Sequence, residues 1–212
     1  TLLHEFSGRG FACEALETSA VALGIARHVN GDDVMFHLSP QTDWAGRFDY
    51  LFAFEVLEHI EDDRAALTAW HAWLKPDGVM LMSVPARMRK WTATDVWAGH
   101  YRRYERVGLI DLIRACGFTV DRCESYGFPL ANIISPLRAR VHARLLAARR
   151  ASNEDTRSRN NDMSGVERRA ESRFYPLLKS LPSRMTMRLA FLLQDWSTGR
   201  DWGDGYLVQI GR

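Results

Sequence analysis

A short acidic stretch with one histidine, FAFEVLEHIED (residues 52–62), has the residue types needed for proton transfer or cation binding. It places Glu55, Glu58 and His59 close together in the chain, and two carboxylates beside an imidazole suit either chemistry. The spacing matches no dedicated metal motif, so we predict no metal here. Hydrogen bonds from Glu58 and His59 to nearby backbone, which would only shape the loop, are the simpler alternative.

A second stretch, WTATDVWAGHYRRYE (residues 91–105), combines aromatic rings with a histidine and paired arginines. Such a loop could cover a small molecule, with the rings against an apolar body and an arginine against an anionic group. An equally weighted alternative is a loop that folds on its own aromatic residues and binds no ligand. The residues that we predict to contact a substrate are Trp91, Trp97, His100, Tyr101 and Arg103.

A third candidate is Glu17, which directly follows an apolar stretch, Phe11–Leu16, that is typical of a buried strand. Nucleotide-binding α/β folds hold ribose hydroxyls with an acid at the end of the second strand, because these strand ends line the ligand crevice. One carboxylate can accept hydrogen bonds from both hydroxyls. The alternative is a solvent-facing glutamate in a loop, which the preceding strand makes less favoured.

The elements that must position these residues alternate between strands and helices from the start to about residue 125, which predicts an α/β fold with a parallel sheet. FDYLFAF (48–54) is apolar enough for a central strand buried on both faces, and KPDG (75–78) predicts a turn. The predicted strands are 11–16, 33–38, 48–54, 79–85 and 118–125, and the predicted helices are 2–8, 20–29, 62–74 and 106–118.

The chain changes character after residue 128. SPLRARVHARLLAARR (135–150) predicts a basic amphipathic helix, residues 151–165 have the composition of a loop, and 177–196 predicts another helix. The last segment, DGYLVQIGR (204–212), predicts a strand antiparallel to Phe118–Glu124. We therefore divide the chain into an α/β core (1–128), a helical insertion that could be a lid or a homodimer contact (129–203), and the last core strand (204–212).

Three segments together, FDYLFAFEVLEHIEDD, LKPDGVMLMSVPA and GHYRRY followed by LIDLIRACGF, resemble class I S-adenosylmethionine-dependent methyltransferases. The nearest subgroup is the quinone-biosynthesis O-methyltransferases, and the resemblance covers residues 1 to about 125 and the final strand. It implies a Rossmann-like, mostly parallel sheet with an antiparallel C-terminal strand and a helical insertion before that strand. It also implies S-adenosyl-L-methionine as the cofactor and methyl transfer to a small-molecule or lipid-like acceptor.

The resemblance assigns cofactor roles to particular residues. The acid that holds the adenosyl ribose in this family falls on Glu17, with Thr18 beside it. The residue that lines the cofactor pocket after the fourth strand falls on Phe54, followed by Glu55 and Val56. We therefore expect Glu17, Phe54 and Glu55 to lie together at the carboxyl edge of the sheet.

The same resemblance suggests roles for the EVLEH motif. In some quinone O-methyltransferases the acids and histidine of this motif bind magnesium, which would give that role to Glu55, Glu58 and His59. Relatives with no known metal carry the pattern as well, so our prediction stays without a metal. If the acceptor is a hydroxyl, a base is needed, and His59 and His100 are the candidates.

Two features depart from the family pattern. The segment HLSPQTDW (37–44) has Ser39 and Gln41 where the family has an acid near adenine. The glycine-rich loop after a first strand is missing, and Gly8-Arg9-Gly10 cannot replace it because it precedes the second strand. We therefore expect TLLHEFSGRG (1–10) to be the tail of the first helix of an N-terminally truncated chain that binds S-adenosylmethionine poorly as it stands.

Two other functions stay open. Glu17 would also suit the ribose of a dinucleotide in an NAD(P)-dependent oxidoreductase, and Tyr175 and Lys179 have the spacing found in short-chain dehydrogenases. That pair follows the polar tract rather than a core strand, however, and the EVLEH motif has no place in that family. The third function, from another class, is a non-catalytic methyltransferase-like partner protein that has lost its cofactor loop.

Composition limits the partners and the compartment. The formal charge of +2 does not argue for a polyanion, and ten arginines against five acids between Arg138 and Arg173 favour a solvated helix face over RNA or a membrane surface. Nucleic acid is therefore not predicted, and peripheral membrane contact through the arginine-rich helix is the weaker alternative. Three cysteines without a paired motif, and no apolar run of spanning length, predict a cytoplasmic protein.

Overall fold

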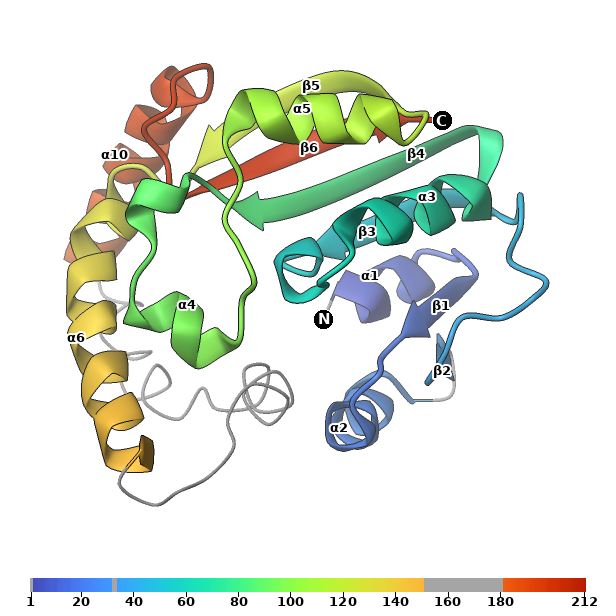
Figure 1. Ribbon diagram of the computed structural model, residues 1–212, viewed down its shortest axis with the longest axis horizontal. Helices are drawn as coiled ribbons and strands as arrows, with labels where there is room; N and C mark the ends of the chain where they lie inside the picture. The colour runs from blue at the N-terminus through green and yellow to red at the C-terminus, as the bar shows by residue number, and fades with distance from the viewer. Residues whose placement is uncertain (1, 32–33, 151–180) are drawn as a thin grey trace.

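The computed structural model describes residues 2–31, 34–150 and 181–212, and its elements alternate as the sequence predicts (Figure 1). The elements in chain order are α1 Leu2–Gly8, β1 Cys13–Leu16, α2 Ala20–Asn30, β2 Val34–His37, β3 Phe48–Phe54, η2 Leu57–His59, α3 Asp63–Trp73, β4 Leu74–Pro85, η3 Met88–Lys90, α4 Ala93–Ala98, α5 Arg106–Ala115, β5 Thr119–Tyr126, α6 Leu130–Arg150, α10 Leu181–Ser197 and β6 Gly205–Gly211.

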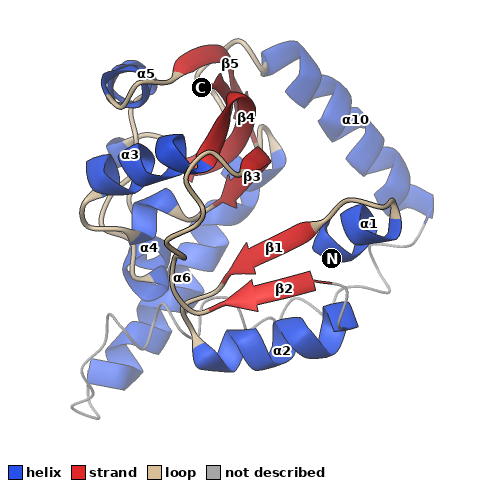
Figure 2. Ribbon diagram, turned by 90° about the vertical axis from the view of Figure 1, so that its right-hand side faces the viewer, coloured by secondary structure: helices blue, strands red, loops and turns tan. Residues whose placement is uncertain are grey.

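The strands form two separate sheets (Figure 2). β1 pairs with β2 in parallel, and the larger sheet has the order β3-β4-β6-β5. β3 and β4 are parallel, whereas β6 runs antiparallel to both β4 and β5. The prediction of a mostly parallel, Rossmann-like sheet with an antiparallel last strand is confirmed, and so is the pairing of that strand with the segment after Phe118.

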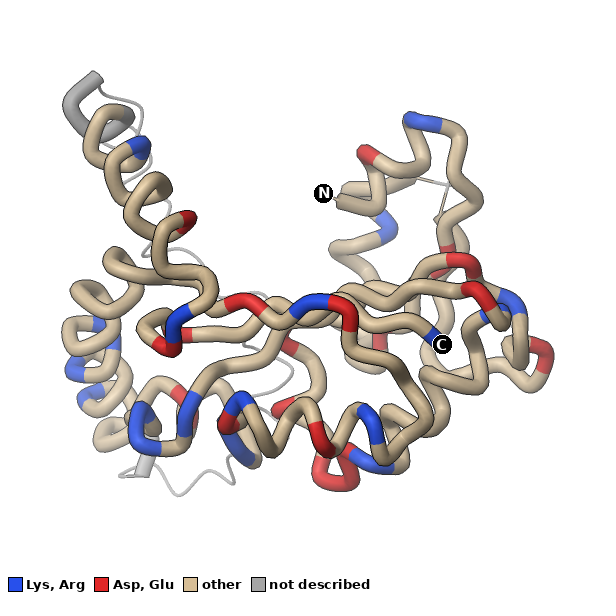
Figure 3. Tube along the Cα trace, turned by 90° about the horizontal axis from the view of Figure 1, so that it is seen from above, with Lys and Arg blue, Asp and Glu red and all other residues tan. Residues whose placement is uncertain are grey.

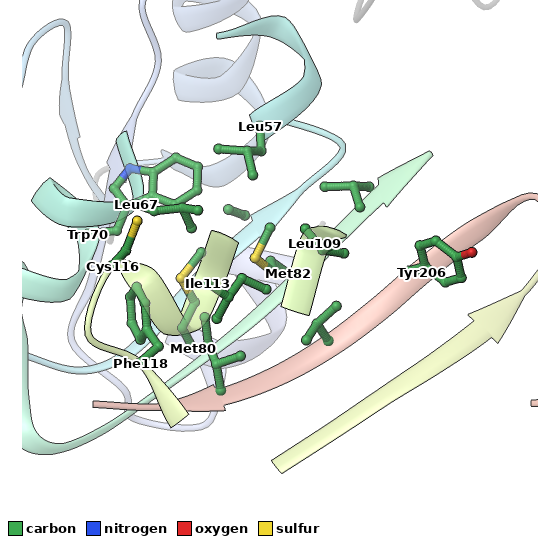
Figure 4. Close-up of a cluster of buried hydrophobic side chains, with 14 of the residues drawn as sticks. Leu57, Leu67, Trp70, Met80, Met82, Leu109, Ile113, Cys116, Phe118 and Tyr206 are labelled. Atoms are coloured by element: carbon green, nitrogen blue, oxygen red, sulfur yellow. The ribbon is translucent and has the colours of Figure 1, made fainter. Parts of the chain in front are cut away.

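The hydrophobic core lies on one face of the larger sheet, under α3 and α5 (Figures 1 and 4). Alternate residues of β4 and β6 point into it, since successive side chains of a strand face opposite sides. The helices contribute residues at helical spacing from their apolar faces. The core residues on these four elements are Met80, Met82, Val84, Tyr206, Val208, Ile210, Leu67, Trp70, Leu109 and Ile113, all buried.

The predicted burial of β3 on both faces is wrong. Ala53 is buried toward the core, but Tyr50, Phe52 and Phe54 on the opposite face are 58%, 43% and 39% exposed. α1 contacts this face through Phe6, which stacks on Phe52 with ring centroids 5.3 Å apart. β3 is also an end strand of its sheet, because β1 belongs to the other sheet. The described neighbours of β3 therefore leave part of its apolar surface exposed.

The first predicted strand is also less buried than its sequence predicts. The strand begins at Cys13 rather than at Phe11, whose side chain is 51% exposed, and β1 itself is only partly buried. With β2 as its single partner, β1 has one edge without a neighbouring strand. The sequence of β1 is as apolar as that of an inner strand, but the strand is only as buried as an edge strand.

The remaining differences are local. The predicted turn at Lys75–Gly78 is instead part of β4, where the register shifts between the pairs Phe48–Leu74 and Tyr50–Val79. Extra residues on β4 are accommodated there as a bulge, so the strand continues through a sequence that resembles a turn. α6 begins at Leu130, before the predicted start, and contains Pro136.

Several local signals act as predicted. Ser19 and Asp62 are the N-caps of α2 and α3, and the Asp62 side chain accepts a hydrogen bond from the Ala65 backbone at 2.9 Å. Gly117, after α5, has a φ of 95° that favours glycine. The polar tract 151–165 and the Tyr175–Lys179 pair lie outside the described residues. Within the described parts of the chain, no helix combines the length and apolarity needed to cross a membrane.

Candidate active site

The loop after β3 is held against two neighbouring strands through Glu55. This residue has a φ of 54°, and its backbone N–H donates to the Ser83 carbonyl at 3.0 Å. Its carboxylate accepts hydrogen bonds from the Ser83 hydroxyl at 2.9 Å and from the Tyr126 hydroxyl at 2.6 Å. Ser83 lies near the end of β4 and Tyr126 ends β5. Glu55 therefore joins three parallel strand ends at the edge where such sheets bind ligands.

Glu58 is a buried acid whose carboxyl oxygens have no hydrogen-bond partner among the described residues. Its side chain is fully buried. Burial, and then the negative charge of Glu55, raise the pKa of Glu58 to about 9. The carboxyl group is therefore protonated and neutral at pH 7.

The segment that contains His100 packs directly on this loop. The Tyr101 backbone N–H donates to the Glu58 carbonyl at 2.8 Å, and the Tyr104 hydroxyl donates to an Asp63 carboxylate oxygen at 3.0 Å. The His59 and His100 rings meet edge to face with centroids 4.7 Å apart. The two sequence motifs that we treated separately thus form a single cluster.

The cluster brings two imidazoles to one carboxyl group. His100 Nε2 lies 3.9 Å from Glu58 Oε1, and one nitrogen or oxygen from each of Glu58, His59 and His100 lies within 4.8 Å of the others. This spacing would admit a cation. Two imidazoles beside a carboxyl group also suit proton exchange with a bound molecule.

Asp95, in α4, connects this cluster to the interior. Its side chain is fully buried and accepts hydrogen bonds from His100 Nδ1 at 3.0 Å, Arg103 Nε at 2.6 Å and the Thr92 backbone at 2.8 Å. Burial acts to raise the pKa of Asp95, but the hydrogen bonds from His100 and Arg103 outweigh it and lower the pKa to about 2. Asp95 is therefore ionised at neutral pH.

The predicted substrate residues occupy different environments. Trp97 stacks on His142 of α6 with centroids 4.4 Å apart and planes within 2° of parallel. Trp91 and Tyr101 are partly buried. The Arg103 side chain is only 5% exposed and also contacts Asp204 at 3.3 Å, so any contact with an acceptor would compete with these bonds. Their roles as substrate contacts stay predictions.

The predicted cofactor residues lie at the carboxyl ends of strands in both sheets. Glu17 follows β1, where its backbone N–H donates to the His37 carbonyl at 2.9 Å and its side chain accepts from the Ser19 backbone at 2.8 Å. Thr18 is exposed beside it. Phe54 ends β3 and is exposed, as are Glu55 and Val56 after it. Their assignment to a cofactor also stays a prediction.

Two residues of the cluster were assigned no function in the sequence analysis. Asp95 lies in the aromatic stretch 91–105, and its spacing of five residues from His100 gives no sign of a contact. Tyr126 could have been found, because it directly follows the predicted strand 118–125, and strand ends gather at the ligand edge.

Fold and site together define an α/β protein with a ligand edge that combines acids and histidines. Residues 1–122 match the model of the methyltransferase domain family, and the chain belongs to this family. No curated protein sequence matches the chain. This membership supports the methyltransferase prediction rather than the oxidoreductase alternative.

Two solved structures illustrate the shared fold. An S-adenosylmethionine-dependent methyltransferase from Mesorhizobium loti is 15% identical, with a TM-score of 0.53, over 95% of this chain and 81% of its own. A methyltransferase from Haloferax volcanii, solved in complex with the Trm112 methyltransferase activator, is 15% identical with a TM-score of 0.50, over 60% of this chain. The match spans 62% of the Haloferax protein's chain.

Proposed function

We propose that this chain catalyses methyl transfer from S-adenosyl-L-methionine to a small-molecule or lipid-like acceptor. The observation that carries the proposal is the convergence of Glu58, His59 and His100 at the carboxyl ends of β3 and β4. Open α/β sheets bind their ligands at this edge. Membership of the methyltransferase domain family supports the same reaction.

The strand-end residues fit the proposed cofactor. Glu17 is partly buried and is fixed to the Ser19 backbone at the end of β1, so its carboxylate is held ready to accept hydrogen bonds from ribose hydroxyls. Phe54 and Val56 offer exposed apolar surface on either side of Glu55. When bound, S-adenosylmethionine supplies a methyl group that is already activated on a sulfonium.

The chain's own residues would then position the acceptor and exclude water. An activated donor requires mainly that the acceptor atom and the methyl carbon be held in line. We assign the acceptor wall to the aromatic segment between β4 and α5, which packs on the Glu58 loop through Tyr101. The proposed acceptor-binding residues are Trp91, Trp97, His100, Tyr101 and Arg103, and the proposed bases are His59 and His100.

We also propose that one more parallel strand belongs between β1 and β3. Both strands have an edge without a partner among the described residues, and β3 exposes three large aromatic rings. A strand placed there would join the two sheets and pair the free backbone groups, which cost about 1–3 kcal/mol each when buried unpaired. A longer gene product, in which this strand and its glycine loop precede Thr1, would supply the rest of the cofactor site.

The basic surface of α6 bears on the proposed partners and location. Arg138, Arg140 and Arg144 are exposed along α6, where basic positions recur (Figure 3). Peripheral contact with an anionic membrane, a homodimer through the helices and a cytoplasmic location are compatible with this surface. The division into a core (1–128), a helical lid (129–203) and a last strand (204–212) is part of the same proposal.

Binding of S-adenosylmethionine to the full gene product tests the proposed function. Calorimetric titration should show binding that Glu17→Ala weakens by about tenfold or more, because a charge-assisted hydrogen bond contributes about 1.5–3 kcal/mol. The control is Asp49→Asn, which alters an exposed carboxylate paired with Lys75 at the other end of β3 and should leave the affinity unchanged. Equal affinity of wild type and Glu17→Ala would remove Glu17 from the site.

A further inference from the structure

The His100 ring is fixed in one orientation by Asp95. The Nδ1 atom lies 3.0 Å from Asp95 Oδ1, and the His100 backbone N–H also donates to the Asp95 carbonyl at 3.0 Å. An ionised carboxylate can only accept hydrogen bonds, so the proton of the neutral ring must be on Nδ1. The lone pair of Nε2 is then free to accept a proton from another group.

The Nε2 side of the ring faces the centre of the cluster. Glu58 Oε1 lies 3.9 Å from Nε2, which is too long for a hydrogen bond, and the His59 ring lies against the same imidazole. The fully buried Glu58 carboxyl has no hydrogen-bond partner among the described residues. A buried polar group without a partner usually marks a functional site or an absent ligand. The Glu58 oxygens are closed to solvent, whereas the His100 side chain is 11% exposed, so His100 rather than Glu58 is the group that an acceptor can reach.

We infer that Asp95 is a positioning residue that holds His100 as the base for a hydroxyl acceptor. The inference rests on the proposed methyltransferase function and deepens it, because it selects one of the two candidate histidines and names the class of acceptor. An alcohol or phenol must lose its proton during methylation, whereas a carboxylate or thiolate acceptor is already anionic and needs no base.

The acceptor O–H proton passes to His100 Nε2 while the acceptor oxygen forms a bond to the methyl carbon. The carbon–sulfur bond breaks, and its electron pair stays on sulfur, which becomes a neutral thioether. His100 becomes an imidazolium, whose charge the ionised Asp95 stabilises through Nδ1, and it later releases the proton to water.

Asp95 also has a structural role that the test must separate. Its carboxylate accepts from the Thr92 backbone, and the Thr92 hydroxyl accepts from the Thr94 backbone at 3.2 Å, which together cap α4. Thr92→Ala removes the hydroxyl part of this cap, including the hydrogen bond at 3.3 Å from that hydroxyl to Asp95, and leaves the Asp95–His100 contact in place. It is therefore a control for the loss of the cap.

The tautomer of His100 can be measured without an acceptor. Nitrogen-15 NMR of the seven labelled histidines in the full gene product, with His100 assigned by His100→Ala, should show a neutral ring protonated on Nδ1. In Asp95→Asn the amide can donate to Nδ1, so the proton should move to Nε2, while Thr92→Ala should keep the wild-type tautomer. An unchanged tautomer in Asp95→Asn would overturn the positioning role.

Methyl transfer from tritiated S-adenosylmethionine tests the acceptor class. The probes are catechol and 1-octanol as hydroxyl acceptors, and benzoate and thiophenol, which are anionic at an assay pH of about 8, as acceptors that need no base. We expect label on a hydroxyl probe, with kcat reduced about 10²–10⁴-fold by His100→Ala and by Asp95→Asn and the KM for the donor unchanged. Thr92→Ala should retain a larger kcat than Asp95→Asn, because it leaves the base and its contact with Asp95 in place.

The outcomes separate the two proposals. Label on the benzoate or thiol probe alone, or full activity in His100→Ala, would overturn the hydroxyl assignment. A wild-type protein that neither binds the donor nor labels any probe would contradict the proposed function, whereas the NMR result would still decide whether Asp95 sets the tautomer of His100.

Discussion

Arg103 Nε lies 2.6 Å from Asp95 Oδ1, in a buried ion pair that links the loop after α4 to the helix before it. The ion pair stabilises the Asp95 carboxylate, which is completely buried and also accepts a hydrogen bond from His100. Arg103 in turn reaches Asp204, just before β6. One arginine thus ties the histidine of the site to the last strand of the core.

Arg103→Ala should lower the free energy of unfolding by about 3–5 kcal/mol, because it leaves the buried Asp95 carboxylate without its cationic partner. Urea unfolding measures the change. The control is Arg102→Ala, whose side chain is 30% exposed and pairs with Asp63, and which should cost about 1 kcal/mol or less. Equal losses in the two variants would show that Arg103 does not stabilise the interior through Asp95.

Glu58→Gln should stabilise the protein at neutral and alkaline pH. The pKa of Glu58 is raised from 4.5 to about 9 on folding, so the unfolded state ionises first and wild-type stability falls as pH rises through this window. Glutamine cannot ionise, and the variant's advantage should grow by about 1.4 kcal/mol per pH unit between these values.

Thermal unfolding from pH 5 to pH 8 measures this advantage, with the exposed Glu61→Gln as the control. The melting temperature of Glu58→Gln should exceed that of wild type increasingly toward pH 8, and Glu61→Gln should follow wild type at every pH. A constant difference between Glu58→Gln and wild type across this range would mean that Glu58 is ionised in the folded protein.

The sequence predicted the elements well because their signals are local. The caps at Ser19 and Asp62 and the breaker at Gly117 are short-range effects that the structure confirms. The last strand was also placed correctly, since an apolar C-terminal segment needs an edge to pair with. The exposure of Phe52 could not be predicted, because burial depends on a neighbouring strand and helix rather than on the strand's own sequence.

The sequence identified several residues of the site but not the contacts between them. Glu17, Glu55 and His59 could be selected because they follow predicted parallel strands, whose ends gather at one edge of the sheet. The packing of His100 against His59 joins segments far apart in the chain, and no local pattern reports such a contact. Asp95 was missed as a functional residue for the same reason.

We predict fast hydrogen exchange along the edge of β3 that faces away from β4. In the 212-residue chain, the amide protons of Phe48–Phe54 that point away from β4 should exchange much faster than those of β4, because no described strand protects them. In the full gene product an added strand should slow their exchange. Identical exchange of β3 in the two proteins would contradict the proposed strand between β1 and β3.

Calorimetric titration of S-adenosylmethionine into the full gene product and into the 212-residue chain distinguishes a complete cofactor pocket from a partial one. We expect micromolar binding by the full gene product. Binding by the 212-residue chain, without the proposed strand and its glycine loop, should be at least about tenfold weaker, a loss of about 1.4 kcal/mol. Equal affinity in both would show that the described residues already form the whole cofactor pocket. No binding by the full gene product would contradict the proposed methyltransferase function itself.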